Sequence, residues 1–210
     1  MKYSPDNQYL AVGGHDDTIY VYKIDTNGNY SLNWKIEYMH SSAITALDWS
    51  RDSRFLKAID QAYLKLYYDC IENVHIKDGS TSLSDPSIWD TSTCKLGWEV
   101  MGVFPAGADG TDINAVDANA DRTRIAAGDD FGTVCIFQFP CTKIQQDCCR
   151  ISGHSEHVPR VRWYEDPNDH NNVKLISCGG MDRTYIQWKK REHFDCHNKM
   201  LVSDAAQIQQ

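Results

Sequence analysis

A ten-residue pattern recurs along this chain, and it constrains the fold more than any other feature. Residues 13–22 read GGHDDTIYVY and residues 179–188 read GGMDRTYIQW, with paired glycines, an aspartate, a threonine and then alternating apolar positions. Residues 127–137, AGDDFGTVCIF, repeat the pattern with an Asp-x-Gly turn, and residues 58–67, AIDQAYLKLY, are a degraded copy. Alternation with a period of two is typical of β-strands that bury one face. The repeat therefore predicts β-hairpins.

The aromatic residue that closes each copy gives the period of the repeat. These residues are Tyr22, Tyr67, Phe137 and Trp188, at intervals of 45, 70 and 51 residues. Another strand–turn–strand segment precedes the copies, most clearly ITALDWSRDSRFL at 44–56. A period of about 45 residues, with four strands in each unit, is that of a propeller blade. We therefore predict an all-β chain built from repeated four-stranded units.

Composition narrows the classes of partner. The formal net charge of -8 argues against binding to a nucleic-acid backbone. No apolar run approaches the roughly 18 residues of a membrane-spanning helix, and the N-terminus MKYSPDNQYL lacks the apolar core of a secretory signal. We therefore expect no membrane partner and a cytoplasmic location, in which the eight cysteines are reduced thiols.

Within the last repeat, the order of Gly-His, strand, turn, strand and Trp resembles the WD-repeat family of β-propellers. In that family a histidine on the loop entering a blade bonds an aspartate in a later turn, and a Ser or Thr and the Trp complete the relay. The resemblance implies a structural relay of His154, Asp182 and Trp188. Cys178 occupies the Ser/Thr position, next to Ser177, so the relay is expected to be weakened.

The other units match this relay only in part. The unit around 40–67 has His40 and Asp60, with Tyr67 in place of the tryptophan. The unit around 113–137 has Asp130 but no Gly-His before it. All of these residues are expected to be structural.

A narrower resemblance covers about 150 residues in unbroken order. Its motifs are HSSAITALDWS (40–50), TCKLGWEVMGVFPAGADGTDINAVD (93–117), GDDFGTVCIFQFPC (128–141), GHSEHV (153–158) and GGMDRTYIQW. Together they resemble the echinoderm microtubule-associated protein-like family. In that family the C-terminal half forms two joined propellers, and these motifs belong to the end of the second.

The resemblance implies a WD-repeat β-propeller represented by about four blades of a larger, seven-bladed ring. We expect a partial propeller over 1–189 and a C-terminal tail over 190–210, with blades at about 1–39, 40–104, 105–151 and 152–189 and an insertion at 70–97. The stretch WEVMGVF (98–104) is interpreted as an apolar strand. The first blade lacks most of its innermost strand and the last its outermost strand. Upstream blades or another chain are therefore expected to complete the ring, because open blades expose apolar faces.

Three constellations allow an enzymatic or metal-binding hypothesis. Carboxylate pairs suited to acid–base work are Asp16-Asp17, Asp109 with Asp112, and Asp129-Asp130. Each pair lies at a turn, where aspartate ordinarily bonds local amides, so turn chemistry is the preferred interpretation. A propeller hydrolase would need further charged groups around a residue such as Asp129. The trio His193, Cys196 and His197 lacks a fourth zinc ligand, so we expect no metal and no cofactor.

The resemblance implies a non-catalytic microtubule-associated protein that presents propeller surfaces to tubulin or to axonemal partners. Its location would be the cytoskeleton, including the axoneme of a cilium. The alternative is a generic WD-repeat scaffold of a complex without microtubules. Because the chain is acidic, contact with the folded tubulin body is favoured over its acidic tails. The unusual loops at 70–97 and 164–172 are the candidate contact regions.

Overall fold

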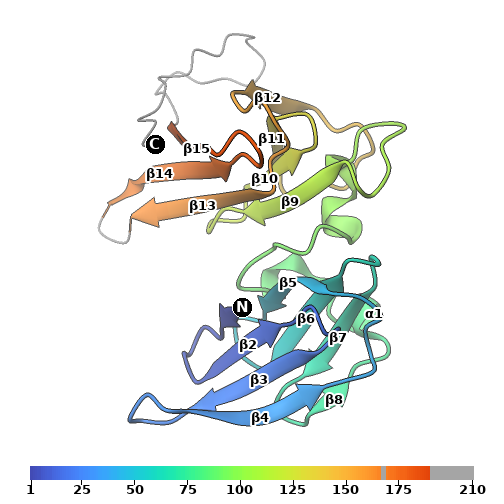
Figure 1. The fold of residues 1–210 in the computed structure, drawn as a ribbon, viewed down its shortest axis with the longest axis vertical. Coiled ribbons are helices and arrows are strands. Elements are labelled where there is room, and N and C mark those ends of the chain that lie inside the picture. The colour runs from blue at the N-terminus through green and yellow to red at the C-terminus, as the bar shows by residue number, and fades with distance from the viewer. Residues whose placement is uncertain (167–168, 190–210) are drawn as a thin grey trace. The chain divides into compact units, whose positions relative to one another are not determined.

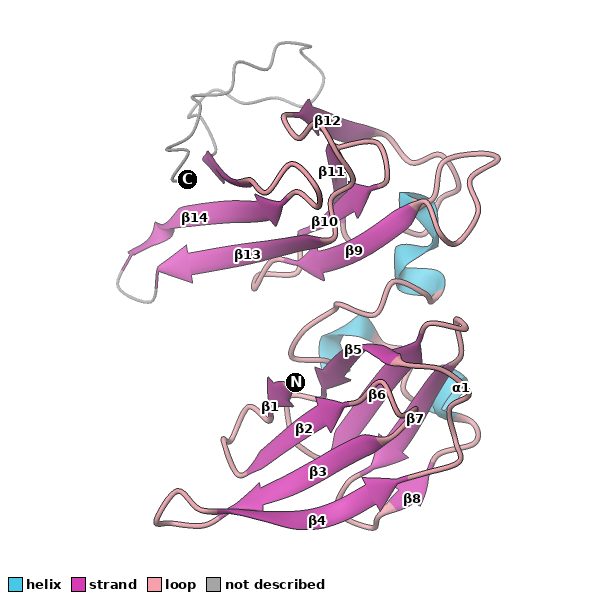
Figure 2. Ribbon diagram, in the orientation of Figure 1, coloured by secondary structure: helices cyan, strands magenta, loops and turns pink. Residues whose placement is uncertain are grey.

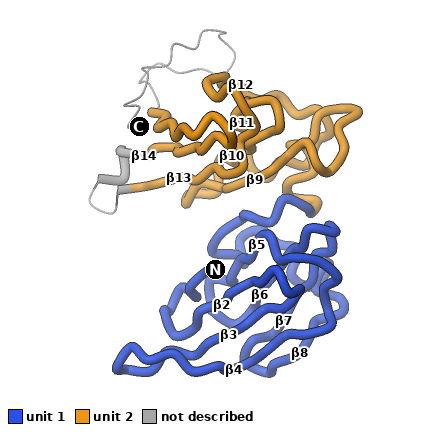
Figure 3. Tube along the Cα trace, in the orientation of Figure 1, with its two compact units in different colours: residues 1–96 blue, residues 97–210 orange. Residues whose placement is uncertain are grey.

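The computed structural model describes residues 1–166 and 169–189, without the side chains of 166–172 (Figure 1). The described residues form antiparallel sheets joined by turns, with one short α-helix and two 3-10 helices (Figure 2). The prediction of an all-β fold built from four-stranded units is confirmed. The chain divides into two compact units, residues 1–96 and 97–210 (Figure 3). None of the described helices is long and apolar enough to cross a membrane.

The first unit contains two four-stranded sheets in which each strand pairs with its neighbours in sequence. The first sheet consists of β1 (Lys2–Tyr3), β2 (Tyr9–Gly13), β3 (Ile19–Ile24) and β4 (Tyr30–Ile36). The second sheet consists of β5 (Ile44–Trp49), β6 (Phe55–Asp60), β7 (Lys65–Asp69) and β8 (Val74–His75). Short turns between adjacent antiparallel strands produce this order.

The second unit repeats the arrangement. Its first sheet, in spatial order β12-β11-β10-β9, consists of β9 (Ile113–Ala118), β10 (Arg124–Asp129), β11 (Thr133–Gln138) and β12 (Cys148–Ser152). Within the described residues the last sheet has three strands, β13 (Arg160–Asp166), β14 (Asp169–Cys178) and β15 (Tyr185–Lys189).

The turn between the first two strands of a sheet is built in the same way three times. A buried polar side chain, Ser4, Ser50 or Asn119, accepts a hydrogen bond from the backbone N–H five residues later, at 2.7 to 2.9 Å. The third residue after it has a positive φ of 57° to 61°, at Asn7, Ser53 and Arg122. These Asx- and Ser-type turns explain the recurrent polar stretch between the paired strands.

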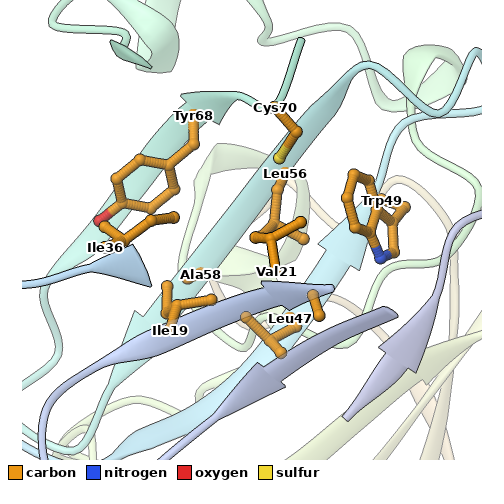
Figure 4. Close-up of a cluster of buried hydrophobic side chains, with 10 residues drawn as sticks. Ile19, Val21, Ile36, Leu47, Trp49, Leu56, Ala58, Tyr68 and Cys70 are labelled. Carbon is orange, nitrogen blue, oxygen red and sulfur yellow. The ribbon is translucent and has the colours of Figure 1, made fainter. Parts of the chain in front are cut away.

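The second sheet of the first unit has apolar side chains on both faces. One face packs against the first sheet, where Trp49, Leu56 and Tyr68 meet Ile19 and Val21 (Figure 4). The full buried set of this cluster is Ala11, Ile19, Val21, Ile36, Leu47, Trp49, Leu56, Ala58, Tyr68 and Cys70.

The other face of that sheet is covered by the insertion at 70–97, which contains α1 (Gly79–Ser82) and η1 (Pro86–Ile88). Leu83 and Trp89 of the insertion are buried against Tyr67, and the Trp89 indole lies 4.5 Å from the Lys57 ammonium. The two largest buried side chains of the insertion therefore belong to the core, and a contact role for its exposed residues stays a prediction.

The first sheet of the second unit is also covered on both faces. Segment 98–104, interpreted from the sequence as a strand, is a 3-10 helix, η2 (Trp98–Val103). Val100 and Val103 are buried while Trp98 and Met101 are exposed, which is the three-residue period of a 3-10 helix. The helix packs against the buried side chains of β10 and β11, and the opposite face of the sheet packs against β13 and β14.

A buried carboxylate joins three distant segments of the first unit. Asp48 in β5 has no exposed surface, and it accepts hydrogen bonds from the Lys2 ammonium at 2.9 Å and from the backbone N–H of Thr93 and Cys94 at 2.9 and 3.0 Å. Lys57 Nζ lies 3.8 Å away. Burial alone would raise the pKa of Asp48, but the two lysines and the hydroxyl hydrogen bonds hold it well below its usual range.

Replacing this carboxylate should destabilise the protein in a pH-dependent way. We expect Asp48→Asn to lower the free energy of unfolding at pH 7 by about 3–5 kcal/mol, since it leaves buried lysine charge uncompensated. The folded pKa is depressed, so the stabilisation is complete above the unfolded pKa of about 3.9 and is lost as the pH falls toward the folded value.

Urea unfolding of the wild type and the variant between pH 7 and pH 2 measures this difference. The exposed turn residue Asp25 supplies the control Asp25→Asn, which removes a carboxylate without burying a charge. A stability gap that stays constant below pH 4 would contradict the assignment of the charge to Asp48.

Candidate functional site

A polar relay joins the loop before β13 to the β14–β15 hairpin. His154 Nδ1 lies 3.1 Å from Asp182 Oδ2 and 3.0 Å from Thr184 Oγ1, and its Nε2 lies 2.7 Å from Ser177 Oγ. The Trp188 indole N–H donates to the same Ser177 oxygen at 2.8 Å. His154 and Ser177 are buried, so the relay is shielded from water at its centre.

The donors and acceptors of the relay are consistent with one arrangement of protons. The Trp188 indole can only donate, so the Ser177 hydroxyl accepts from it and donates its own proton to His154 Nε2. His154 then carries its proton on Nδ1 and donates it to the Asp182 carboxylate. Burial would raise the pKa of Asp182, but hydrogen bonds from Thr184 and His154 lower it, which keeps the acceptor ionised. A fully satisfied network of this kind fixes one geometry.

The glycines of the repeat make room for the relay. A Cβ on Gly153 would lie 2.7 Å from the Trp188 ring, and a Cβ on Gly179 would lie 1.9 Å from the Asp182 carboxylate. Both contacts are shorter than a side chain tolerates. Glycine therefore stands directly before His154 and three residues before Asp182, because the tryptophan ring and the aspartate carboxylate approach the backbone at these two positions.

Ser177, and not the predicted Cys178, is the hydroxyl-position residue of the relay. Ser177 pairs with Ile186 across the hairpin and points inward, whereas Cys178 pairs with Tyr185 and is exposed. Adjacent residues of a strand point to opposite faces, so only one of the two can reach His154. The sequence places both candidates side by side, and the register decides between them.

The first unit contains a shorter version of the relay. His40 Nδ1 lies 3.1 Å from Asp60 Oδ2, and both side chains are fully buried. Asp60 also accepts the backbone N–H of Leu64 at 2.9 Å, which fixes the β6–β7 turn. Burial lowers the pKa of His40, partly opposed by Asp60, so this histidine is neutral at pH 7.

This shorter relay lacks its hydroxyl. In register, Ala58 stands where Ser177 stands in the last sheet, and Tyr68 takes the place of Trp188. Tyr67, predicted for that place, belongs to the opposite face of the sheet. His40 Nε2 and the Tyr68 hydroxyl are consequently buried without a hydrogen-bond partner among the described residues. Their rings lie 6.1 Å apart.

Asp130 does not belong to a relay. It is exposed and accepts a hydrogen bond from Asn114 Nδ2 at 2.7 Å. The adjacent Asp129 accepts the backbone N–H groups of Phe131 and Thr133 at 2.9 and 2.7 Å, which is turn chemistry. The segment before β9 supplies no histidine, so no relay partner exists there.

The remaining carboxylates also act within their own turns. Asp109 bonds Thr111, and Asp16 accepts the Tyr20 hydroxyl at 2.6 Å. In residues 1–166 and 169–189, no group of three or more His, Cys, Asp or Glu side chains is arranged to hold a metal ion. His193, Cys196 and His197 lie outside the described residues.

One tryptophan in each unit connects two neighbouring sheets, a feature that sequence reasoning missed. Trp49 Nε1 donates to the Lys2 carbonyl at 3.0 Å, and Trp163 Nε1 donates to the Asp117 carbonyl at 2.9 Å. Trp163 also donates its backbone N–H to the Asp117 carboxylate at 2.8 Å. The sequence feature that could have identified them is a tryptophan at the same position in the first strand of two sheets, Trp49 in β5 and Trp163 in β13.

The relay predicts unequal effects for two adjacent substitutions. We expect Ser177→Ala to lower the free energy of unfolding by about 1–3 kcal/mol, because it leaves buried His154 and Trp188 donors and acceptors unpaired. Cys178→Ala, on the exposed side of the same strand, should change it by less than about 0.5 kcal/mol. Equilibrium denaturation of both variants measures the two values, and equal effects would contradict the register described above.

The incomplete relay predicts a stabilising substitution. Ala58→Ser should raise the free energy of unfolding by about 1 kcal/mol, because the new hydroxyl can pair with both His40 Nε2 and the Tyr68 hydroxyl. Ala127 occupies the same register position in β10, but no histidine lies on the loop before β9. Ala127→Ser should therefore bury a hydroxyl without a relay partner and lower the free energy of unfolding by about 1–3 kcal/mol. Denaturation curves compare the two, and a loss of stability in both would contradict this interpretation.

Comparison with known proteins places these features in a family. Residues 1–190 match the family model of the echinoderm microtubule-associated protein second beta-propeller. Echinoderm microtubule-associated protein-like 4 from Homo sapiens is 40% identical over 204 residues, covering 97% of this chain and 20% of that protein. Echinoderm microtubule-associated protein-like 1 from Mus musculus is 41% identical over 191 residues, covering 90% of this chain and 22% of that protein. The chain thus spans about a fifth of the length of these relatives.

A solved structure supports the architecture. The Cps50 (Swd1) beta-propeller domain from Myceliophteria thermophila superposes with a TM-score of 0.61 at 16% identity, covering 99% of this chain and 69% of that one. This likeness concerns the fold alone, a WD-repeat β-propeller. The family model that matches residues 1–190 shows that the chain belongs to the echinoderm microtubule-associated protein-like family.

Proposed function

We propose that this chain is a non-catalytic interaction module that binds the folded body of tubulin through the turns at one end of its second-unit sheets. The names of its relatives connect the family to microtubules. The observation that carries the proposal is a pair of exposed apolar side chains on neighbouring turns. Phe131 is 78% exposed and Met181 is 75% exposed.

These two side chains flank one loop. A Cβ on Gly132, in the β10–β11 turn, would lie 2.4 Å from the His154 carbonyl oxygen. Gly180, in the β14–β15 turn, donates its N–H to the His157 carbonyl at 2.9 Å. The turns and the loop are therefore in contact, and we call residues 130–132, 154–157 and 180–183 the turn surface.

The chemistry of the turn surface suits a protein partner. Its apolar side chains are surrounded by polar groups, among them Glu156 and His157, whose side chains lie 3.3 Å apart. Apolar anchors with a polar rim are the usual anatomy of protein interfaces. The net charge of -8 disfavours the acidic tubulin tails, which leaves the folded body as the complementary target.

The carboxylates on and near this surface support a binding role over catalysis. Asp129 and Asp182 are occupied by backbone amides of their own turns, and Asp182 also by His154. Their oxygen atoms accept hydrogen bonds that stabilise the fold, and this favours an interaction module over a hydrolase. A cytoskeletal location, including the axoneme of ciliated cells, would follow from this function.

Co-sedimentation with taxol-stabilised microtubules tests the proposal. We expect the chain to pellet with intact microtubules and with microtubules whose acidic tails have been removed by subtilisin. The double variant Phe131→Ala, Met181→Ala should bind about tenfold or more weakly, because truncating two interface anchors costs more than 1 kcal/mol each. Ile144→Ala is the matched control, since Ile144 is 69% exposed and lies between β11 and β12, at the other end of β11.

Two outcomes would count against the proposal. If the wild type pellets and the double variant binds equally well, the turn surface is not the contact. If the wild type pellets with neither kind of microtubule, the generic scaffold in a complex without tubulin becomes the better account.

A further inference from the structure

Two cysteines of the second unit share one face of the β11–β12 pair. Cys135 in β11 lies opposite Arg150, and Cys148 in β12 lies opposite Phe137, so the two cysteines are diagonal neighbours. The Cys135 thiol and the Cys148 sulfur are hydrogen-bonded to each other. Arg150 lies two residues along the same strand and also hydrogen-bonds the Cys148 sulfur. These contacts form a thiol pair beside a permanent cation.

The two sulfurs have different surroundings. Cys135 is 7% exposed and packs in the core cluster that contains Phe137 and Phe139, whereas Cys148 lies at the margin of this cluster and is only partly buried. The hydrogen bond to Cys148 and burial raise the pKa of Cys135. The hydrogen bond from Cys135 lowers the pKa of Cys148 to about 7, against the effect of burial, and Arg150 contributes in the same direction. Of the two thiols, Cys148 is therefore the one that ionises first.

The other thiols with shifted pKa values have raised values, whereas the pKa of Cys148 is lowered, and a lowered pKa favours reactivity. Burial raises the pKa of Cys70 and of Cys94, and it raises the pKa of Cys141 to about 12. Protonated, buried thiols are inert, because the thiolate is the nucleophile. Cys148 combines a lowered pKa, partial access to solvent and a second thiol in its own cluster. This is the arrangement of a peroxide-sensitive cysteine with a resolving partner.

We propose that Cys148 is a site of reversible oxidation by hydrogen peroxide and that Cys135 resolves the product as a disulfide between β11 and β12. In the first step the Cys148 thiolate attacks one peroxide oxygen, the O–O bond breaks and hydroxide leaves, which gives a sulfenic acid. In the second step the Cys135 sulfur attacks the Cys148 sulfur, and the S–O bond breaks. The departing hydroxide takes up the Cys135 proton as water. Overall, two thiols lose two electrons and one peroxide becomes two waters.

Peptide mapping of the peroxide-treated chain tests this directly. Trypsin cleavage after Arg124, Lys143 and Arg150 yields IAAGDDFGTVCIFQFPCTK and IQQDCCR. We expect these two peptides to become disulfide-linked, with fragmentation assigning the bond to Cys135 and Cys148, and dithiothreitol to reverse it. The map needs no substitution, so it does not depend on whether a variant folds.

Variants separate the two steps. Cys148→Ser should abolish the crosslink, whereas Cys141→Ser and Cys149→Ser should keep it. Cys135→Ser should trap the first product and raise dimedone labelling of Cys148 about fivefold or more over the wild type. Exposed Cys178 is the internal reference for unassisted oxidation. A crosslink from Cys148 to Cys141 or Cys149, or faster labelling of Cys178 than of Cys148, would overturn the proposal.

Discussion

A β-sheet with apolar side chains on both faces is stable only when each face is covered, and much of this structure follows from that constraint. The sheets β5–β8 and β9–β12 both carry such side chains, and each is covered twice within its own unit. A neighbouring sheet covers one face. The other is covered by an irregular segment, either the insertion with Leu83 and Trp89 or the 3-10 helix with Val100 and Val103. Irregular segments that lie outside the repeat pattern therefore contribute to the hydrophobic core.

Burial on both faces leaves the ends of the strands as the places where a sheet can meet a partner, and the polar relays make these ends rigid. His154 is held by three side chains of the β14–β15 hairpin, so the exposed Glu156 and the partly exposed His157 beside it belong to a fixed loop. A pre-organised loop loses little conformational freedom on binding, which favours its use as a contact surface. The same buried relay thus links the internal stability of the blade to its proposed function.

The repeat predicts the strand order and the residue types of the relay, but it does not predict the register. His154 and Asp182, which the order of Gly-His, turn aspartate and Trp in the repeat identified, lie 3.1 Å apart. Ser177 and Cys178, or Tyr68 and Tyr67, cannot be told apart by periodicity, because a shift of one residue exchanges the two faces of a strand. The contribution of the insertion to the core could not be predicted for a related reason. Its polar composition hides two large buried side chains, and burial depends on the sheet it covers.

Register also explains why the thiol pair bears on the turn surface. Strand β11 begins just after Phe131 and passes Cys135, while β12 begins at Cys148 and ends at Ser152, directly before the His154 loop. The two strands that carry the thiols are therefore the strands that hold the first two parts of the turn surface. A disulfide between Cys135 and Cys148 would therefore link β11 and β12 covalently, away from the exposed side chains of the turn surface. Diagonal partners lie about 7–8 Å apart, slightly more than a disulfide spans, so the backbone at the start of β12 must shift when the link forms. Once formed, the link would restrict the fraying of β12.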